Sequence, residues 1–135
     1  MSPNPLDTLD LRERISAVLS EFVAEHRSQM LEISQDSVSL VDSLSQLLEG
    51  GKRLRPAFAY WGYRAAGGKD NDAVVSACAS LEFSQACALI HDDVMDASDT
   101  RRGKPAAHKQ FEAMHQQNNW GGSSISFGVG AAILI

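Results

Sequence analysis

The feature that most constrains the fold is an almost continuous apolar stretch from about residue 73 to residue 95, which ends in a run of carboxylates. Asp70, Asn71 and Asp72 come just before it, and these residue types cap helix N-termini. A helix that is apolar almost all round is typical of a central helix surrounded by others. We therefore expect a buried helix over residues 73–95 that carries aspartates at its C-terminal end.

The rest of the chain has the same helical period. Apolar residues recur at three-to-four spacing over residues 11–23 and 40–48, which predicts two further amphipathic helices. Another helix is expected from about residue 55 to the glycines near residue 67. Residues 116–124 indicate a loop before another apolar segment, and strand-like alternation of useful length does not occur. The expected fold class is all-α, a helical bundle.

Composition and charge indicate which kinds of binding partner and which cellular compartment to expect. The formal net charge of -5 argues against nucleic acid as a partner. The N-terminal segment lacks a basic start followed by an apolar core, and uninterrupted apolar runs fall short of a membrane span. We expect no transmembrane segment and a cytoplasmic protein. Cys78 and Cys87 are expected to be small buried core residues in a reducing compartment.

The end of the sequence lies inside the apolar run FGVGAAILI, with no polar closing segment and no C-cap glycine. A domain that ends inside a helix leaves apolar faces uncovered. We therefore expect residues 1–135 to be the N-terminal portion of a single all-helical domain, truncated at its C-terminus.

The carboxylate run DDVMD combines with two arginines that follow it. Asp92 and Asp96 are four residues apart and share a face of the expected helix, so they can hold a divalent cation through oxygen ligands. Such a cation would offset their mutual repulsion and their unfavourable position at a helix C-terminus. Arg101 and Arg102 add guanidinium groups that bind phosphate oxygens bidentately. Metal and arginine around one spot indicate diphosphate chemistry.

A second basic cluster, GGKRLRP, occupies residues 50–56. Its paired glycines let the backbone approach an anion, and three cations follow within four residues: Lys52, Arg53 and Arg55. The next helix begins here, and its N-terminal dipole also favours anions. Alone, a basic turn of this kind is usually surface charge. Together with the aspartates and the paired arginines, it predicts that two anionic substrates are brought together.

In this order and spacing, GGKRLRP, Gln85, DDVMD and DTRRGKP resemble the N-terminal half of the trans-isoprenyl diphosphate synthases, the polyprenyl synthetase family. The resemblance covers roughly residues 45–135 and is greatest to geranylgeranyl diphosphate synthases. It implies an isoprenoid synthase helical bundle around a central cavity, of which only the N-terminal helices are present. It also implies Mg²⁺-dependent condensation of isopentenyl diphosphate with an allylic diphosphate (dimethylallyl, geranyl or farnesyl), two or three Mg²⁺ ions, and a homodimer in the full-length form.

The resemblance also assigns roles to residues. Asp92 and Asp96 would be the metal ligands, Asp93 would support them, and Arg101 would contact the allylic diphosphate; these four form the expected catalytic group. The isopentenyl diphosphate would be held by four polar side chains: Lys52, Arg55, Gln85 and Arg102. Glu82, which lies on an otherwise apolar helix, is expected to pair with a cation near the site.

Product length depends on the helix face below Asp92. In the family, bulky aromatics four and five positions before the first aspartate stop growth at fifteen carbons, whereas Cys87 and Ala88 are small. The expected chain-length tunnel is lined by Cys87, Ala88, Ser84 and Leu81. We expect a product of twenty carbons or longer, with geranylgeranyl diphosphate favoured. Alternatively, the small residues only allow close helix packing, and Phe83 or a downstream residue forms the floor.

Other functions remain open at this stage. The chain could be a non-catalytic, regulatory subunit of a heteromeric prenyl synthase, although the aspartates and arginines of the site are intact. It could be a helical HD-type phosphohydrolase that uses His91 and Asp92 as a metal pair, with His26 as a further ligand, or a helical protein that only binds. The second aspartate motif of the family is absent, so the 135-residue segment alone is expected to be inactive.

Overall fold

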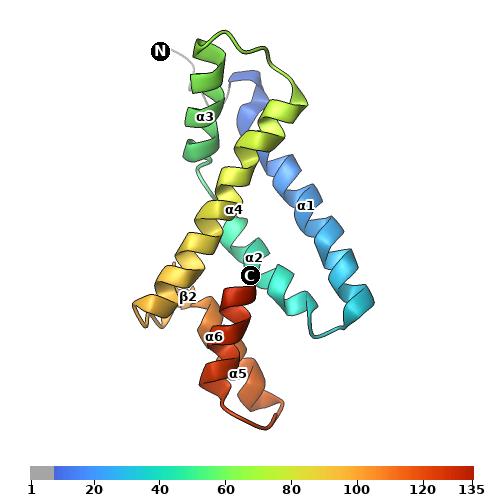
Figure 1. Ribbon diagram of the computed structural model, residues 1–135, viewed down its shortest axis with the longest axis vertical. Coiled ribbons are helices and arrows are strands. Elements are labelled where there is room, and N and C mark those ends of the chain that lie inside the picture. The colour runs from blue at the N-terminus through green and yellow to red at the C-terminus, as the bar shows by residue number, and fades with distance from the viewer. Residues whose placement is uncertain (1–7) are drawn as a thin grey trace.

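The computed structural model describes residues 8–135 and is almost entirely helical (Figure 1). Its elements follow one another in this order: η1 (Thr8–Asp10), α1 (Leu11–Ile33), α2 (Val38–Leu48), α3 (Leu54–Ala65), α4 (Asp72–Met95), β1 (Thr100–Arg101), β2 (Lys104–Pro105), α5 (Ala107–Gln117) and α6 (Ser124–Leu134). The predicted all-α class is confirmed. The expectation about the N-terminal segment falls partly on residues 1–7, which lie outside the described residues.

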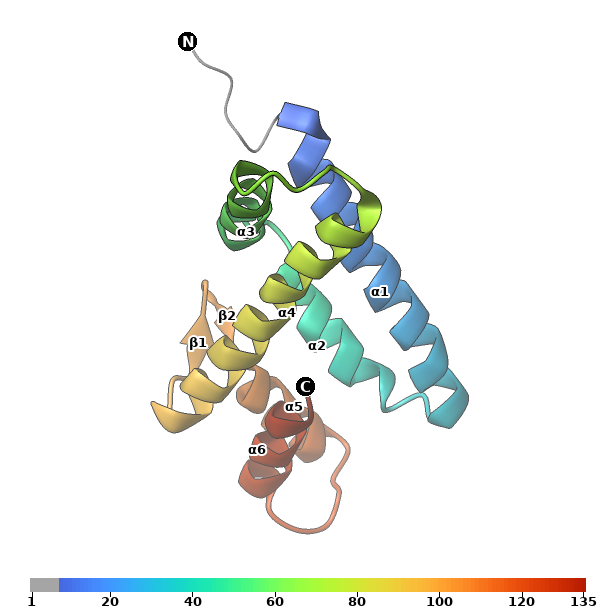
Figure 2. The ribbon, with the colours of Figure 1, turned by 45° about the horizontal axis from the view of Figure 1, so that its top comes forward.

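The long helix α4 organises the other elements. Its N-terminus is capped by Asn71, whose side-chain oxygen accepts a hydrogen bond from the Val74 N–H at 2.9 Å. In both ribbon views α1 and α3 lie along its N-terminal half, while the β1–β2 hairpin, α5 and α6 gather near its C-terminal end (Figures 1 and 2). The aspartates at the end of α4 are therefore placed among the C-terminal elements.

The main core fixes the N-terminal half of α4. Leu11, Ile15 and Leu19 recur every four residues, so they share one face of α1, and all three are buried. They pack with Tyr60 of α3 and Val75 of α4, both of which are also fully buried. This cluster joins three helices and sets where α4 begins.

A smaller core holds the C-terminal elements against the other end of α4. Ile90 of α4, Ala107 of α5 and Ala132 of α6 form this cluster. The helices α5 and α6 approach closely at Gly128, where an added Cβ would lie 2.3 Å from the carbonyl oxygen of His108. Only glycine fits this contact without a shift of the backbone. The close packing makes α5 and α6 a compact unit behind the hairpin.

The expectation that α4 is covered on all sides is wrong for residues 8–135. The helices that pack on α4 contact one face of it, which carries the buried residues Val75, Ala79 and Ile90. The opposite face is exposed, and it includes Cys87. The prediction of a buried cysteine is therefore confirmed for Cys78 and wrong for Cys87. A helix that is apolar on every face does not reveal which face its neighbours cover.

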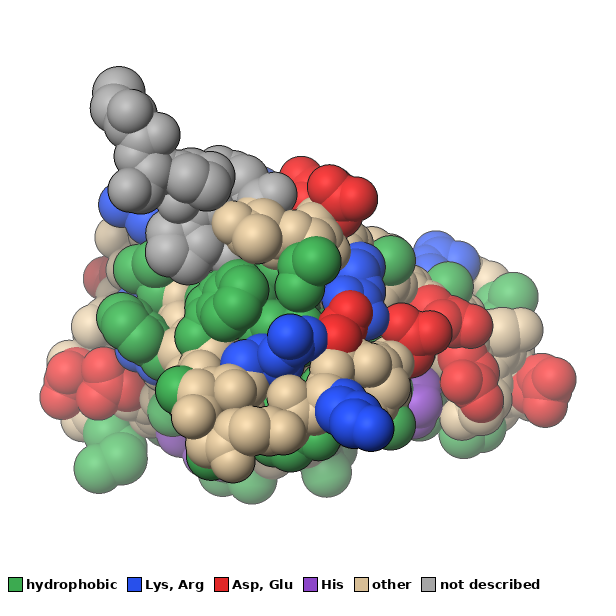
Figure 3. All heavy atoms as spheres, turned by 90° about the horizontal axis from the view of Figure 1, so that it is seen from above, with side chains coloured by type: hydrophobic (Ala, Val, Ile, Leu, Met, Phe, Trp, Pro, Cys, Tyr) green, Lys and Arg blue, Asp and Glu red, His purple; other side chains and the backbone are tan. Residues whose placement is uncertain are grey.

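Helix α4 is also long and apolar enough to cross a membrane, with a mean hydropathy of 1.5 in its most apolar window. A core helix of a soluble protein has the same properties, and α4 packs against five other helices, so the length and hydropathy of α4 are weak evidence for a membrane span. The absence of a transmembrane segment stays a prediction. Seen from above, basic and acidic side chains lie side by side among exposed apolar ones (Figure 3).

Candidate active site

A two-stranded hairpin follows α4 and returns the chain to it. Thr100 pairs with Pro105 and Arg101 with Lys104 in antiparallel register. The two turn residues, Arg102 and Gly103, have φ angles of 52° and 76°. Positive φ at both positions is typical of the tight turn that joins two short strands. The sequence analysis did not predict this hairpin. The local signal for it was the glycine at the second turn position, Gly103.

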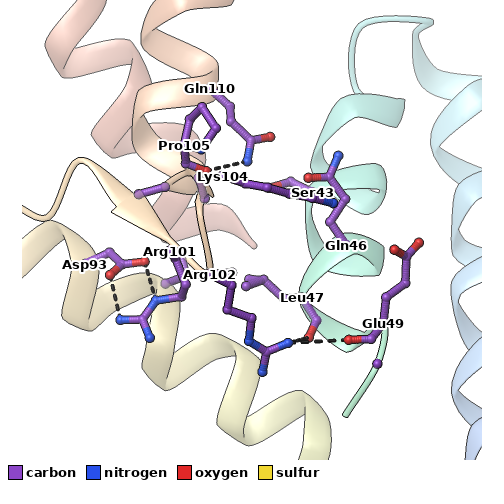
Figure 4. A pocket seen from close by; sticks show the side chains of 14 residues that line it. Ser43, Gln46, Leu47, Glu49, Asp93, Arg101, Arg102, Lys104, Pro105 and Gln110 are labelled. Carbon is purple, nitrogen blue, oxygen red and sulfur yellow. Dashed lines mark hydrogen bonds and ion pairs between the residues drawn. The ribbon is translucent and has the colours of Figure 1, made fainter.

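The hairpin places Arg101 against the buried carboxylate of Asp93 (Figure 4). Nε of Arg101 donates to Oδ2 at 2.7 Å and Nη2 donates to Oδ1 at 2.6 Å, a bidentate pair. Asp93 is only 2% exposed, whereas Arg101 keeps a quarter of its side-chain surface exposed. Asp93 therefore fixes the orientation of the Arg101 guanidinium, and its predicted support of the metal ligands Asp92 and Asp96 stays a prediction.

Arg101 also lies near the first aspartate of the motif. Its Nη2 is 3.9 Å from Oδ2 of Asp92. The hydrogen bonds to Asp93 raise the pKa of Arg101 above its ordinary value, the charges of Asp93, Asp92 and Asp96 add to the rise, and burial opposes it. The guanidinium is therefore a permanent positive charge beside the exposed carboxylates.

Asp92 and Asp96 are exposed at the end of α4. Within residues 8–135, groups of three or more His, Cys, Asp or Glu side chains that could hold a metal ion do not occur. The carboxylate of Asp93 is paired with Arg101. Two carboxylates nevertheless fit Mg²⁺, which commonly takes one or two of them and completes its octahedron with water and phosphate oxygens. The assignment of Asp92 and Asp96 as metal ligands stays a prediction.

The four residues predicted to hold isopentenyl diphosphate line a single pocket of about 420 Å³. They come from the loop after α2, from α3, from α4 and from the hairpin turn: Lys52, Arg55, Gln85 and Arg102. Lys52, Arg55 and Arg102 are exposed, so they remain available to an anion. The structure thus brings together groups that the sequence places far apart, and their binding role stays a prediction.

Arg102 connects this basic pocket to a neighbouring one. It also lines a pocket of about 360 Å³ that contains Arg101 and Lys104 (Figure 4). Its Nη1 donates to the carbonyl oxygens of Leu47 and Glu49, both at 3.4 Å. These long contacts hold the side chain at the boundary between the loop and the hairpin, between the two arginine-lined spaces.

The predicted tunnel residues share the exposed face of α4. They lie on the N-terminal side of Asp92 along that face: Cys87, Ala88, Ser84 and Leu81. The structure therefore leaves this face open within the described residues, and the role of the four residues in product length stays a prediction.

The histidines give no support to the phosphohydrolase reading. Nε2 of His91 is buried, and its Nδ1 lies 3.9 Å from Sγ of Cys87. His26, on α1, hydrogen-bonds through Nδ1 to the Phe22 carbonyl and stacks on the Phe22 ring. His91 and His26 thus take part in local packing, and the described residues gather no histidine-aspartate metal group.

The fold and the site define an all-helical protein in which carboxylates end a long central helix beside two arginine-lined pockets. The chain belongs to the polyprenyl synthetase family, whose sequence profile matches residues 37–126. It is 38% identical over 101 residues to octaprenyl diphosphate synthase of Escherichia coli, an alignment that covers 73% of this chain and 31% of that protein. It is 40% identical over 94 residues to geranylgeranyl pyrophosphate synthase 12 of Arabidopsis thaliana, covering 65% of the chain and 26% of the relative.

A solved structure agrees with this assignment. The crystal structure of geranylgeranyl pyrophosphate synthase from Corynebacterium glutamicum, complexed with isoprenyl diphosphate and magnesium, matches with a TM-score of 0.82 and 41% sequence identity. The match covers 96% of this chain and 38% of that one. The chain therefore spans between a quarter and a third of the length of the curated relatives it matches.

Proposed function

We propose that this chain forms the N-terminal portion of a Mg²⁺-dependent trans-prenyltransferase that condenses isopentenyl diphosphate with an allylic diphosphate. The observation that carries the proposal is the pair of adjoining pockets: one gathers Lys52, Arg55, Gln85 and Arg102, and the other holds Arg101 beside the aspartate motif. Two anion-binding regions side by side suit a reaction between two diphosphates. The Corynebacterium relative, complexed with isoprenyl diphosphate and magnesium, supports the substrate class and the metal.

The chemistry required of the chain is positioning and electrostatic stabilisation. The allylic C–O bond breaks, a new C–C bond forms to the alkene of isopentenyl diphosphate, a proton is lost and diphosphate leaves. Mg²⁺ held by Asp92 and Asp96 would supply Lewis-acid stabilisation to the leaving diphosphate. Arg101, held by Asp93 and permanently charged, would bind the oxygens on which negative charge develops. The basic pocket would orient the isopentenyl diphosphate for attack.

A chimaera tests this function, because the 135-residue chain alone is proposed to be inactive. In the chimaera, residues 8–135 replace the matching segment of the Corynebacterium geranylgeranyl pyrophosphate synthase. With Mg²⁺, labelled isopentenyl diphosphate and farnesyl diphosphate, we expect an extended prenyl diphosphate from the chimaera and none from the isolated chain. Removal of Mg²⁺ with a chelator should abolish product formation. A folded chimaera that forms no product, beside an active parent enzyme, would favour a regulatory subunit instead.

We also propose that the product contains twenty carbons or more, with geranylgeranyl diphosphate favoured. Replacing Ala88 with phenylalanine in the chimaera should shorten the product, because the added ring would stand on the exposed face of α4 one turn from Asp92. The measurement is the chain length of the labelled lipid. Ala73→Phe, at the far end of the same helix, is the matched control and should leave the length unchanged. An unaltered product from Ala88→Phe would contradict the tunnel.

The remaining proposals concern assembly and location. We propose a cytoplasmic homodimer in the full-length form, without nucleic acid as a partner. The net charge of -5 supports the last of these points. Sedimentation of the chimaera would give its oligomeric state, and a monomer that is fully active would contradict the dimer.

A further inference from the structure

In the basic cluster GGKRLRP, residues 50–56, which includes the loop before α3 and the start of that helix, one arginine is buried while the other two cations are exposed. Lys52 and Arg55 are exposed, but Arg53 is only 7% exposed. Arg53 immediately precedes α3 and has a φ of 55°, in the left-handed region that is unfavourable for a residue with a side chain. A conformation of this kind persists only where surrounding contacts hold it.

The contacts that hold Arg53 come from two other helices. Its Nη1 donates to Oε2 of Glu82 on α4 at 3.0 Å, and its Nε donates to Oγ of Ser16 on α1 at 3.4 Å. The side chains of Arg53 and Glu82 are 8% and 12% exposed, so water screens this ion pair little. Glu82 thereby gains the cationic partner that the sequence could not name. The pair ties the loop to α4 at one point.

The backbone of the loop is fitted closely around this pair. A Cβ added to Gly51 would lie 2.6 Å from Nη1 of Arg53 and 3.1 Å from Oε2 of Glu82. The absence of a side chain at position 51 is therefore needed for the ion pair to lie directly beside the loop. This contact gives the second glycine of the motif a packing role.

The same pair sets the loop relative to the polar group on α4. Glu82 precedes Gln85 by three residues, so the two side chains neighbour each other on one side of the helix. Arg53, Glu82 and Gln85 all line the pocket that also contains the exposed cations of the loop. A shift of the loop along α4 would change the spacing between Gln85 and those cations.

We propose that the Arg53–Glu82 ion pair positions the diphosphate-binding groups Lys52, Arg55 and Gln85, without itself contacting the diphosphate. The assignment of this diphosphate to isopentenyl diphosphate rests on the proposed function. The pair presets the distance between the loop and α4, so that binding a diphosphate does not have to order the loop.

Replacing Glu82 with glutamine separates this role from simple electrostatics. If only the charge of the pocket mattered, removal of a carboxylate would tighten the binding of an anion. If the pair positions the loop, the same change weakens it, because the uncharged amide holds Arg53 less firmly. We expect Glu82→Gln to raise the Kd for inorganic pyrophosphate about 10-fold, the lower end of the range for residues that orient direct ligands. The measurement is calorimetric titration of the 135-residue chain in metal-free buffer.

Two further variants control for stability. Arg14→Gln removes another ion pair between helical segments, in which Arg14 contacts Asp70 at 3.0 Å and Asp72 at 2.9 Å, and these three residues do not line the pocket. It should lower the unfolding temperature and leave the Kd unchanged. Arg53→Lys keeps the charge but loses the guanidinium fork, so its Kd should lie between those of the unsubstituted chain and Glu82→Gln.

The chimaera gives an independent measurement. There, Glu82→Gln should raise the KM for isopentenyl diphosphate about 10-fold while the KM for the allylic substrate stays unchanged. Pyrophosphate binding that is equal or tighter in Glu82→Gln would overturn the positioning role even if the chimaera is active. Weaker binding with an inactive chimaera would retain it and reject the proposed function. No saturable pyrophosphate binding by the unsubstituted chain would overturn the positioning role, whereas the proposed function would still be decided by product formation in the chimaera.

Discussion

Replacing Asp92 with asparagine is expected to lower the kcat of the chimaera by about 10²-fold or more, the scale of losing one group that stabilises charge in a transition state. The change removes one of the two exposed carboxylates that can hold Mg²⁺ at the end of α4. The Mg²⁺ concentration that gives half-maximal rate should rise as well. Because Asp92 is exposed, the unfolding temperature of the variant chimaera should differ little from that of the unsubstituted one. Initial rates over a range of Mg²⁺ concentrations measure both effects.

Asp99→Asn is the matched control for this experiment. Asp99 is also exposed and follows the same motif, but its carboxylate lies 3.5 Å from Nζ of Lys109 on α5. This variant loses the same formal charge and should keep its rate within about 3-fold, since exposed ion pairs contribute little. Equal losses in Asp92→Asn and Asp99→Asn would show that general charge, and not a metal ligand, determines the rate.

Asp93→Asn is expected to reduce both stability and activity. The side chain of Asp93 is 3% exposed, and an amide in its place would lose the charge of a bidentate pair and present a donor to the Arg101 guanidinium. Breaking one partner of a buried pair costs about 3 kcal/mol. Arg101 would also lose its fixed orientation, so the KM for the allylic diphosphate should rise. Denaturant unfolding of the chain and steady-state kinetics of the chimaera measure the two effects.

A double-mutant cycle tests whether the two residues act together. If Asp93 acts through Arg101, then Asp93→Asn should change the KM of a chimaera that already carries Arg101→Gln by much less than it changes the unsubstituted one. Equal changes in both backgrounds would mean that Asp93 affects the substrate by a route that does not involve Arg101.

The helices could be predicted from the sequence because their signals are local. The repeat of Leu11, Ile15 and Leu19 places one face of α1 in the core, and Asn71 caps α4 where the sequence offered a cap. The basic cluster, Gln85 and Arg102 were also singled out by motif, and they line one pocket; the placement of Asp92 and Asp96 as metal ligands stays a prediction. That the basic cluster, Gln85 and Arg102 line one pocket could be known only from the three-dimensional structure, since Lys52 and Arg102 come from separate elements.

The features that could not be predicted depend on contacts between distant segments. Cys87 is exposed because the packing partners of α4 all lie on its other face, and an apolar helix does not encode which face that is. The partner of Glu82 is Arg53. The sequence offers three neighbouring cations in residues 50–56, and only the geometry of the loop shows which of them reaches Glu82. The hairpin has two-residue strands, too short for an alternating pattern.

At position 102, in the turn of that hairpin, the backbone conformation and the charge of the side chain favour different amino acids. Arg102 has a φ of 52°, a conformation that glycine adopts without the cost of about 1 kcal/mol borne by other residues. Glycine at position 102 would thus relax the backbone, yet it would remove the cation that borders both pockets. The backbone geometry of the turn and the charge of the two pockets therefore favour different amino acids at position 102, and the chain carries the cation in a strained conformation.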